Sequence, residues 1–281
     1  SGFGNLLATP AYGWSGHATR AGLSGPQATS WAMQQAATAG FSAWEPLLSS
    51  PEDASRVGDL ARAHGLAMPS IFLTGTLHKA DCAGEALDRF QKTAAIAAHY
   101  VCQHVMVYPS ALPGQAYKSD RELTLQAAQL TILSRNLRPL GIHLCYHPED
   151  PEMRRAACEF HHMMLATDAT DVALCLDPDT IFRATGHSRL AVMDSLSLFG
   201  HRVAALHLRQ MQSGVWSEAL GPGDLDYPAI IAALVGAHVT PALIVELAIE
   251  DLTAITLAPQ DAHRQSLDYV RQYLLPIIGT T

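Results

Sequence analysis

The chain has 281 residues, of which 48% are hydrophobic, and a formal net charge of −8. This length and hydrophobicity allow a large core, and we interpret residues 1–281 as one domain. The negative charge disfavours a nucleic-acid partner, because DNA-binding surfaces need clustered Lys and Arg, and no apolar run approaches the roughly 18 to 20 residues of a membrane span. The same charge favours a small neutral or weakly charged substrate. The five cysteines show no CxxC pairing, which favours a reducing, cytoplasmic setting.

Short runs rich in Val, Ile, Leu, Phe and Cys alternate along the chain with longer amphipathic segments, as in a parallel sheet covered by helices. The expected strands are residues 5–9, 41–45, 67–73, 104–108, 143–147, 172–177, 203–208 and 242–247. Helix starts are expected at Ser50, Ser119 and Asp150. Helices are expected to end with a C-terminal cap in the left-handed conformation at Gly40, Gly65, Gly141 and Gly200.

Eight strand-helix units predict an α/β fold, a single (β/α)8 TIM barrel. An open doubly wound sheet would more often show a glycine-rich phosphate loop after its first strand, and neither GxGxxG nor GxxxxGK[ST] occurs in the sequence. In such barrels the active site lies at the carboxyl ends of the strands. The last residue of each strand is therefore the first candidate for a catalytic or ligand-binding residue.

The last four strands end in polar residues that suit a divalent metal: His147, Asp177, His207 and Glu246. If these side chains face the barrel axis, period-two alternation also turns Cys145, Cys175, Ala205 and Ile244 inward, and turns Leu176, Leu206 and Val245 toward the helices. Two imidazoles and two carboxylates suit Mn²⁺, Co²⁺, Zn²⁺ or Fe²⁺. Such an ion has room for two vicinal substrate oxygens and would polarise a carbonyl group.

Four stretches are similar to the xylose isomerase-like TIM-barrel superfamily, the sugar phosphate isomerase/epimerase family: LDP at 176–178, LHLR at 206–209, LGPGDLD at 220–226 and VEL at 245–247. That group includes tagatose and psicose 3-epimerases, hydroxypyruvate isomerase, inosose isomerases and dehydratases, and the more distant endonuclease IV. The resemblance implies a metal held by Glu, Asp, His and Glu at these strand ends, with the two glutamates moving protons in the epimerases. It also makes a homo-oligomer, a dimer or tetramer, plausible.

Two positions depart from the epimerase pattern. His147 stands where the epimerases have Glu, so His147 is the preferred ligand and Glu149 its substitute. Thr180 stands where the epimerases place a substrate-binding His. The resemblance implies one divalent metal, with Mn²⁺ the first choice and Co²⁺, Zn²⁺, Mg²⁺ and Fe²⁺ as alternatives.

The resulting hypothesis is a divalent-metal-dependent isomerase or epimerase acting on a keto-sugar, polyol-derived ketone or related hydroxy-carbonyl through an enediolate. Glu246 would take the carbon-bound proton. If a neighbouring hydroxyl leaves instead, the same site is a dehydratase (lyase) for an inosose-like or oxidised sugar, with His147 as the acid. A non-catalytic sugar-binding or accessory barrel subunit is the alternative of another class.

Further substrate contacts are proposed from the rim of the barrel. Arg209 either anchors substrate oxygens or pairs with an acidic neighbour. Glu45 ends the second strand, where members of the family it resembles often have a Glu that contacts the substrate or a neighbouring loop. His78 follows the third strand, and Trp216 lies in a rim loop where an aromatic face can cover a sugar.

Overall fold

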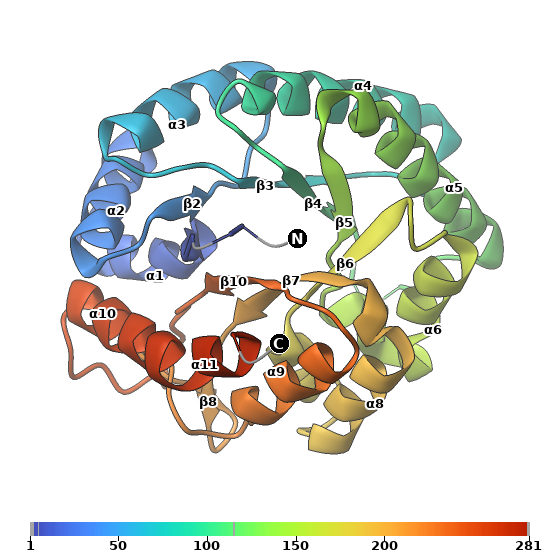
Figure 1. The fold of residues 1–281 in the computed structure, drawn as a ribbon. Coiled ribbons are helices and arrows are strands. Elements are labelled where there is room, and N and C mark those ends of the chain that lie inside the picture. The colour runs from blue at the N-terminus through green and yellow to red at the C-terminus, as the bar shows by residue number, and fades with distance from the viewer. Residues whose placement is uncertain (1–2, 5, 115, 280–281) are drawn as a thin grey trace.

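Eight parallel strands surrounded by helices form a barrel in the computed structural model, which describes residues 3–4, 6–114 and 116–279 (Figure 1). The barrel strands are β1 (Ala8–Pro10), β2 (Ala43–Glu45), β3 (Ser70–Gly75), β4 (His104–Pro109), β5 (His143–Tyr146), β6 (Val172–Leu176), β7 (Val203–Leu208) and β10 (Ala242–Val245). Their order is β2-β1-β10-β7-β6-β5-β4-β3. Parallel bridges join Ala43 to Ala67 and Leu47 to Phe72, so the edge at β2 meets the edge at β3. The predicted TIM barrel is confirmed.

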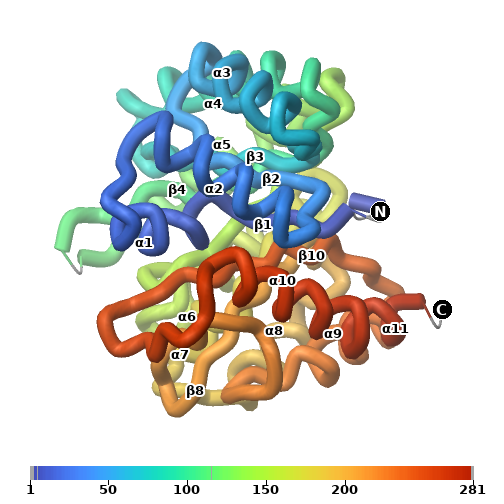
Figure 2. Tube along the Cα trace, turned by 90° about the vertical axis from the view of Figure 1, so that its left-hand side faces the viewer, coloured from blue at the N-terminus to red at the C-terminus, as the bar shows by residue number. Residues whose placement is uncertain are grey.

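The helices form an outer ring, with α3 and α4 on one side of the strands and α8, α9 and α11 on the other (Figure 2). They are α1 (Tyr12–Arg20), α2 (Gly25–Ala39), α3 (Pro51–Ala63), α4 (Ala80–Ala98), α5 (Asp120–Leu137), α6 (Asp150–Ala166), α7 (Pro178–Ala184), α8 (Arg189–Phe199), α9 (Tyr227–Gly236), α10 (Pro259–Tyr269) and α11 (Leu275–Ile278). A short antiparallel hairpin, β8 (Met211–Gln212) and β9 (Val215–Trp216), follows β7.

The strands lie where the sequence places them, with shifts of a few residues at their ends. The third strand begins at Ser70 rather than at residue 67, because Pro69 has no N–H to give to a sheet. The fifth and eighth strands end before His147 and Glu246, although both backbone N–H groups still bond to the neighbouring strand, at 2.9 Å and 3.0 Å. Residue 5, the expected start of the first strand, lies outside the described residues.

Most of the expected helix caps are present. The Ser50 hydroxyl accepts the N–H of Asp53, and Ser119 forms a capping box with Glu122. Helix α6 begins at Asp150 as expected, but the capping residue is Glu149. Gly40, Gly65 and Gly141 have positive φ angles of 108°, 71° and 73°. The prediction for Gly200 is wrong: its φ is −55°, because α8 continues there into a 3₁₀ turn and the chain needs no left-handed residue.

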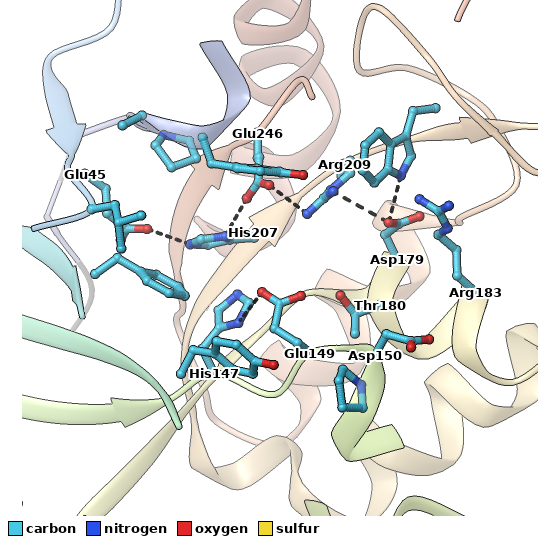
Figure 3. Close-up of a pocket in the computed structure, with 18 residues that line it drawn as sticks. Glu45, His147, Glu149, Asp150, Asp179, Thr180, Arg183, His207, Arg209 and Glu246 are labelled. Carbon is cyan, nitrogen blue, oxygen red and sulfur yellow. Dashed lines mark hydrogen bonds and ion pairs between the residues drawn. The ribbon is translucent and has the colours of Figure 1, made fainter. Parts of the chain in front are cut away.

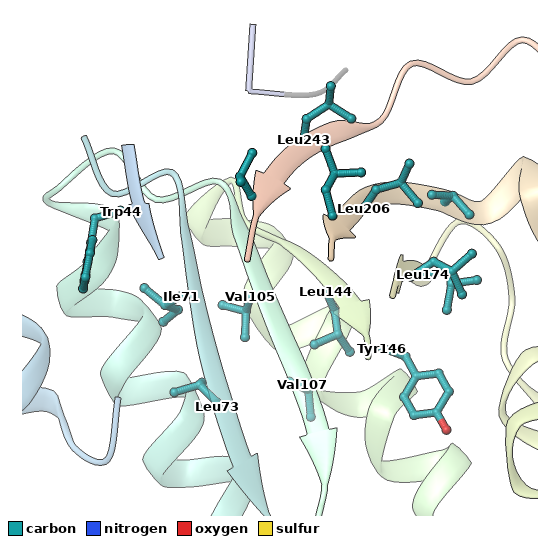
Figure 4. Close-up of a cluster of buried hydrophobic side chains, with 14 of the residues drawn as sticks. Trp44, Ile71, Leu73, Val105, Val107, Leu144, Tyr146, Leu174, Leu206 and Leu243 are labelled. Carbon is teal, nitrogen blue, oxygen red and sulfur yellow. The ribbon is translucent and has the colours of Figure 1, made fainter. Parts of the chain in front are cut away.

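The hydrophobic core has two layers. The inner layer fills the barrel with small or slender side chains, including Cys145, Cys175, Ala205 and Ile244. The outer layer lies between strands and helices and contains larger side chains such as those in Figure 4, among them Leu206. The predicted inward and outward directions along the last four strands are therefore confirmed, and the polar residues that follow the inward positions reach the rim of the barrel.

Two findings bear on the expected setting. No helix within the described part of the chain is both long and apolar enough to cross a membrane. All five cysteines are free thiols.

Candidate metal and substrate site

Polar side chains from the carboxyl ends of the strands meet at one rim of the barrel (Figure 3). His147 follows β5, Asp177 follows β6, His207 lies in β7 and Glu246 follows β10, and all four side chains are buried. The ring centroids of His147 and His207 are 4.8 Å apart. Nδ1 of His207 lies 2.7 Å from Oε2 of Glu246. His147, His207 and Glu246 line one cavity.

Asp177 joins this group through Arg209 rather than by lining the cavity. Its Oδ1 accepts the backbone N–H of Asp179 at 3.0 Å, which caps α7, and its Oδ2 accepts from Nη2 of Arg209 at 2.8 Å. The same Nη2 lies 2.7 Å from Oε1 of Glu246. One guanidinium nitrogen therefore links two of the predicted metal ligands. The ion pair expected for Arg209 is present, and this side chain also lines the cavity.

Arg209 is held by its backbone as well. Its N–H donates to the hydroxyl of Tyr227 at 2.9 Å, and that hydroxyl donates to the carbonyl of Arg209 at 2.5 Å. The guanidinium carbon lies 4.5 Å from the centroid of the Trp216 ring. Burial alone would lower the pKa of Arg209, but the carboxylates of Glu246 and Asp177 raise it, so the side chain stays charged.

Two imidazoles and a thiol form a group that suits a metal ion. Donor atoms of His147, Cys175 and His207 lie within 4.8 Å of one another, and all three residues are buried. Among the described residues, neither ring nitrogen of His147 makes a hydrogen bond, and Oε1 of Glu149 lies 3.3 Å from Nδ1, so both nitrogens are available to a ligand. Burial, and then the nearby His207, hold the pKa of His147 well below its ordinary value. The ring is therefore neutral, the form that binds metals, and the residues fit a divalent ion.

His207 lies between two carboxylates, as Figure 3 shows. Its Nε2 is 2.8 Å from Oε1 of Glu45, opposite the contact with Glu246. Burial alone would lower the pKa of His207, but the sulfur of Cys175 and the carboxylate of Glu45 raise it well above its ordinary value. A metal ion that binds this ring would therefore displace a proton from it. Burial alone would raise the pKa of Glu246, but Arg209 and His207 lower it to about 2. Glu246 is therefore ionised at neutral pH.

Acidic side chains outnumber guanidinium groups around the cavity. Its carboxyl groups are those of Glu45, Glu149, Asp150, Asp179 and Glu246, and its guanidinium groups are those of Arg183 and Arg209. Burial, and then the charge of Asp177, raise the pKa of Glu149 to about 7 and that of Asp179 to about 7. Such shifts mark an excess of negative charge in a poorly solvated place, and an added cation would relieve it.

The cavity has a volume of about 670 Å³, within the range of roughly 300 to 1,000 Å³ that small-molecule sites occupy. Trp216 on β9 forms part of its wall and donates its Nε1–H to Oδ2 of Asp179 at 3.0 Å. Tyr12, Phe72 and Tyr108 add aromatic surface. Aromatic walls with a few polar groups suit a sugar-sized molecule.

The other predicted contacts divide into those that line the cavity and those that do not. Glu45 lines it. Glu149, the substitute ligand, also lines it, with Oε1 3.3 Å from Nδ1 of His147. His78 is buried but is not among the cavity-lining residues. Thr180, at one of the positions that depart from the epimerase pattern, lines the cavity too.

Sequence reasoning missed several residues of the cavity, chiefly Tyr12, Tyr108, Asp150, Asp179 and Arg183. Asp179 and Arg183 had a usable signal, since they lie four residues apart in α7 and so share one face of a helix that starts beside Asp177. Tyr12 had none, because its place depends on how α1 packs across the barrel mouth.

Comparisons with known proteins agree with this architecture. The sequence profile described as the xylose isomerase-like TIM barrel matches residues 33–273. The chain belongs to this family. No curated protein sequence is similar enough to this xylose isomerase-like barrel to count as a match.

Solved structures similar to this barrel include three sugar epimerases. L-ribulose 3-epimerase is 16% identical, with a TM-score of 0.73 over 98% of this chain and 96% of the other. D-allulose 3-epimerase from Methylomonas sp., in complex with D-allulose, is 16% identical, with a TM-score of 0.73 over 95% and 96%. 3-Keto-D-glucoside 4-epimerase from E. coli is 14% identical, with a TM-score of 0.66 over 95% and 98%. At these identities the similarity shows the fold.

Proposed function

We propose that this protein is a divalent-metal-dependent isomerase or epimerase of a keto-sugar, a polyol-derived ketone or a related hydroxy-carbonyl compound. The observation that supports this most is the meeting of His147, His207 and Glu246 on one wall of a sugar-sized cavity. The fold is also that of epimerases of L-ribulose and D-allulose. Mn²⁺ is our first choice of metal, with Co²⁺, Zn²⁺, Mg²⁺ and Fe²⁺ as alternatives.

Each polar residue of the wall has a part in this proposal. His147, His207 and Glu246 would hold the metal, with Asp177 as a fourth ligand. When bound, the metal would polarise the substrate carbonyl and make the neighbouring C–H more acidic. The ionised carboxylate of Glu246 faces the cavity and would accept the proton from carbon. The N–H groups of Arg209 would stabilise negative charge on the substrate oxygens.

Hydrogen exchange in D₂O tests this proposal. The protein, with its metal content measured, is incubated with ketoses, inososes and oxidised glycosides in the presence of Mn²⁺, and loss of a C–H signal is followed by NMR. We expect exchange with at least one of these classes, and Glu246→Gln should abolish it while metal stays bound. Glu85→Gln, on the exposed face of α4, is the matched control and should exchange like the unaltered protein. Protein that holds no metal and gains no exchange from added metal would instead favour a non-catalytic sugar-binding or accessory barrel.

One observation favours a dehydratase, or lyase, as the second candidate. Glu149 lines the cavity beside His147, and its pKa is raised to about 7 by burial and by neighbouring carboxylates. A carboxyl group that is half protonated near neutral pH can give a proton to a leaving hydroxyl. The substrate would then be an inosose-like or oxidised sugar. The homo-oligomeric state and the cytoplasmic location remain predictions.

A further inference from the structure

Arg209 and a divalent ion would need the same carboxylate oxygen. Oδ1 of Asp177 already accepts the N–H of Asp179 at the start of α7, so a metal on Oδ1 would share that oxygen with the helix cap, whereas Oδ2 contacts only a side chain that can move. That Oδ2 is the atom that Nη2 of Arg209 contacts at 2.8 Å, and the same nitrogen is 2.7 Å from Glu246. A divalent ion placed between the carboxylates of Asp177 and Glu246 would repel a guanidinium that contacts the same oxygens.

A second position for the guanidinium lies next to the first. Within the part of the chain that the structure describes, Nε of Arg209 is a buried donor without a hydrogen-bond partner and Oδ1 of Asp179 is a buried acceptor without one. Nε is 3.7 Å from the other oxygen of Asp179, which Trp216 holds in place through its Nε1–H. A short movement of the guanidinium toward Asp179 would satisfy the unpaired donor and acceptor together. The aromatic face of Trp216 lies alongside, 4.5 Å from the guanidinium carbon.

The geometry points to Arg209 as a displaceable counter-ion of the metal site. A divalent ion takes the oxygens of Asp177 and Glu246, and the guanidinium moves onto Asp179, where its N–H groups turn to the substrate. Metal binding would thereby prepare the substrate anchor, so that metal is loaded first and substrate second. This inference rests on the proposed metal site, and its test measures metal affinity rather than turnover.

The first measurement is the affinity for Mn²⁺ by calorimetric titration without substrate. Because the arginine competes with the ion, Arg209→Gln should bind Mn²⁺ about tenfold more tightly than the unaltered protein. Arg183→Gln is the matched control: Arg183 is also a cavity arginine, stacked 4.6 Å from Trp216, but it contacts no predicted metal ligand. It should change the affinity less than about threefold. Equal or weaker binding by Arg209→Gln would overturn the inference.

A double-mutant cycle separates displacement from simple charge effects. Asp179→Asn removes the second position, so it should weaken Mn²⁺ binding about fivefold or more when Arg209 is present. In the Arg209→Gln background there is no guanidinium to accommodate, so Asp179→Asn should weaken Mn²⁺ binding less than about twofold. If Asp179→Asn has the same effect in both backgrounds, the two side chains act independently and the inference is wrong.

A further variant covers the case in which Arg209→Gln does not fold. Arg209→Lys keeps the positive charge but has a shorter side chain that lacks Nη2, the nitrogen that contacts the carboxylates of both Asp177 and Glu246. Tighter Mn²⁺ binding by Arg209→Lys would therefore come from lost competition and not from a deleted charge, whereas unchanged affinity would count against displacement. Failure here is distinguishable from failure of the proposed function, because the proposed function fails when metal-saturated protein exchanges no C–H proton, whatever its affinity for Mn²⁺.

Discussion

Glu45 contacts the nitrogen of His207 that faces away from Glu246. Oε1 of Glu45 lies 2.8 Å from Nε2, and Ser70 donates its hydroxyl to Oε2 of Glu45 at 2.5 Å. Metal-binding histidines commonly have a carboxylate on the second ring nitrogen, which fixes the orientation of the ring and makes it a better ligand. In this arrangement Nδ1 of His207 is directed to the metal ligands, and Glu45 is a positioning residue that acts through His207.

Replacing Glu45 should therefore weaken metal binding without unfolding the protein. For Glu45→Gln we expect the dissociation constant for Mn²⁺ to rise about 10- to 100-fold. Calorimetric titration measures this, and circular dichroism checks the fold. Ser70→Ala removes only the support of Glu45, so its effect should be smaller and of the same sign. If Glu45→Gln binds Mn²⁺ as the unaltered protein does, then Glu45 does not position His207.

Replacing Glu149 would distinguish the proposed isomerase from the proposed dehydratase. If it is the acid for a leaving hydroxyl, Glu149→Gln should lower elimination of water about 100-fold or more and leave C–H exchange in D₂O nearly intact. Because the acid must be protonated and its pKa is about 7, the rate of elimination should fall as the pH rises through that value. Asp150→Asn, the adjacent cavity carboxyl, is the control. An equal loss of exchange and elimination in Glu149→Gln would exclude a role confined to the leaving group.

Periodicity predicted the barrel and the meeting of strand ends, because alternation along a strand decides which side chains point inward. Cys145 and Ala205 fill the barrel as the alternation requires, and His147 and His207 follow them onto the rim. Apolar runs and spacing thus predicted the fold and brought three of the four candidate ligands, His147, His207 and Glu246, to the cavity, while their role as ligands stays a prediction.

Contacts made by loops could not be predicted in this way. Arg209 follows β7, where no period governs side-chain direction, and its bridge between Asp177 and Glu246 depends on the position of three separate segments. The hairpin that carries Trp216 has only two residues in each strand, too few to show an alternation. The displacement proposed for Arg209 is therefore visible only with the side chains in place.

The buried carboxyl of Glu152 should make stability depend on pH. Burial, and then Glu159, raise its pKa from an ordinary 4.5 to about 8. The folded protein therefore keeps a proton that the unfolded chain releases, and this part of the free energy of unfolding decreases as the pH rises from 4.5 toward 8. Glu152→Gln removes the titration, and its amide oxygen can still accept the N–H of Glu149, which Oε2 of Glu152 accepts at 2.8 Å.

Urea unfolding at several pH values measures this difference. We expect Glu152→Gln to be more stable than the unaltered protein at pH 8, by about 2 to 4 kcal/mol, and nearly equal to it at pH 5. Glu85→Gln, on the exposed face of α4, should show no such dependence. At each pH the free energy of unfolding of Glu152→Gln is compared with that of the unaltered protein. If the variant's advantage is smaller at pH 8 than at pH 5, the raised pKa of Glu152 is contradicted.

Arg202 should be needed for stability, although it does not line the cavity and forms no ion pair with a carboxylate of the described residues. This buried side chain donates to the backbone carbonyls of Met164, Thr167, Asp168 and Val172, and so ties the end of α6 to the start of β6. Arg202→Met would keep most of the apolar packing but remove the guanidinium from these carbonyls, of which that of Asp168 still accepts the N–H groups of Asp171 and Val172. Each unpaired buried polar group lowers the free energy of unfolding by about 1 to 3 kcal/mol. Because water can reach some of these carbonyls in the variant, we expect Arg202→Met to lower the free energy of unfolding by about 3 kcal/mol in total.

Arg138→Met is the matched control for this prediction, because Arg138 is also bonded to the loop before β6 but has a side chain that is 61% exposed. Its ion pair with Asp171 lies at the surface on the arginine side, where such pairs contribute less than about 1 kcal/mol. Thermal and urea unfolding of both variants should therefore separate them clearly. Similar small losses in the two would mean that water replaces the guanidinium of Arg202 and that its burial adds little to the stability of the barrel.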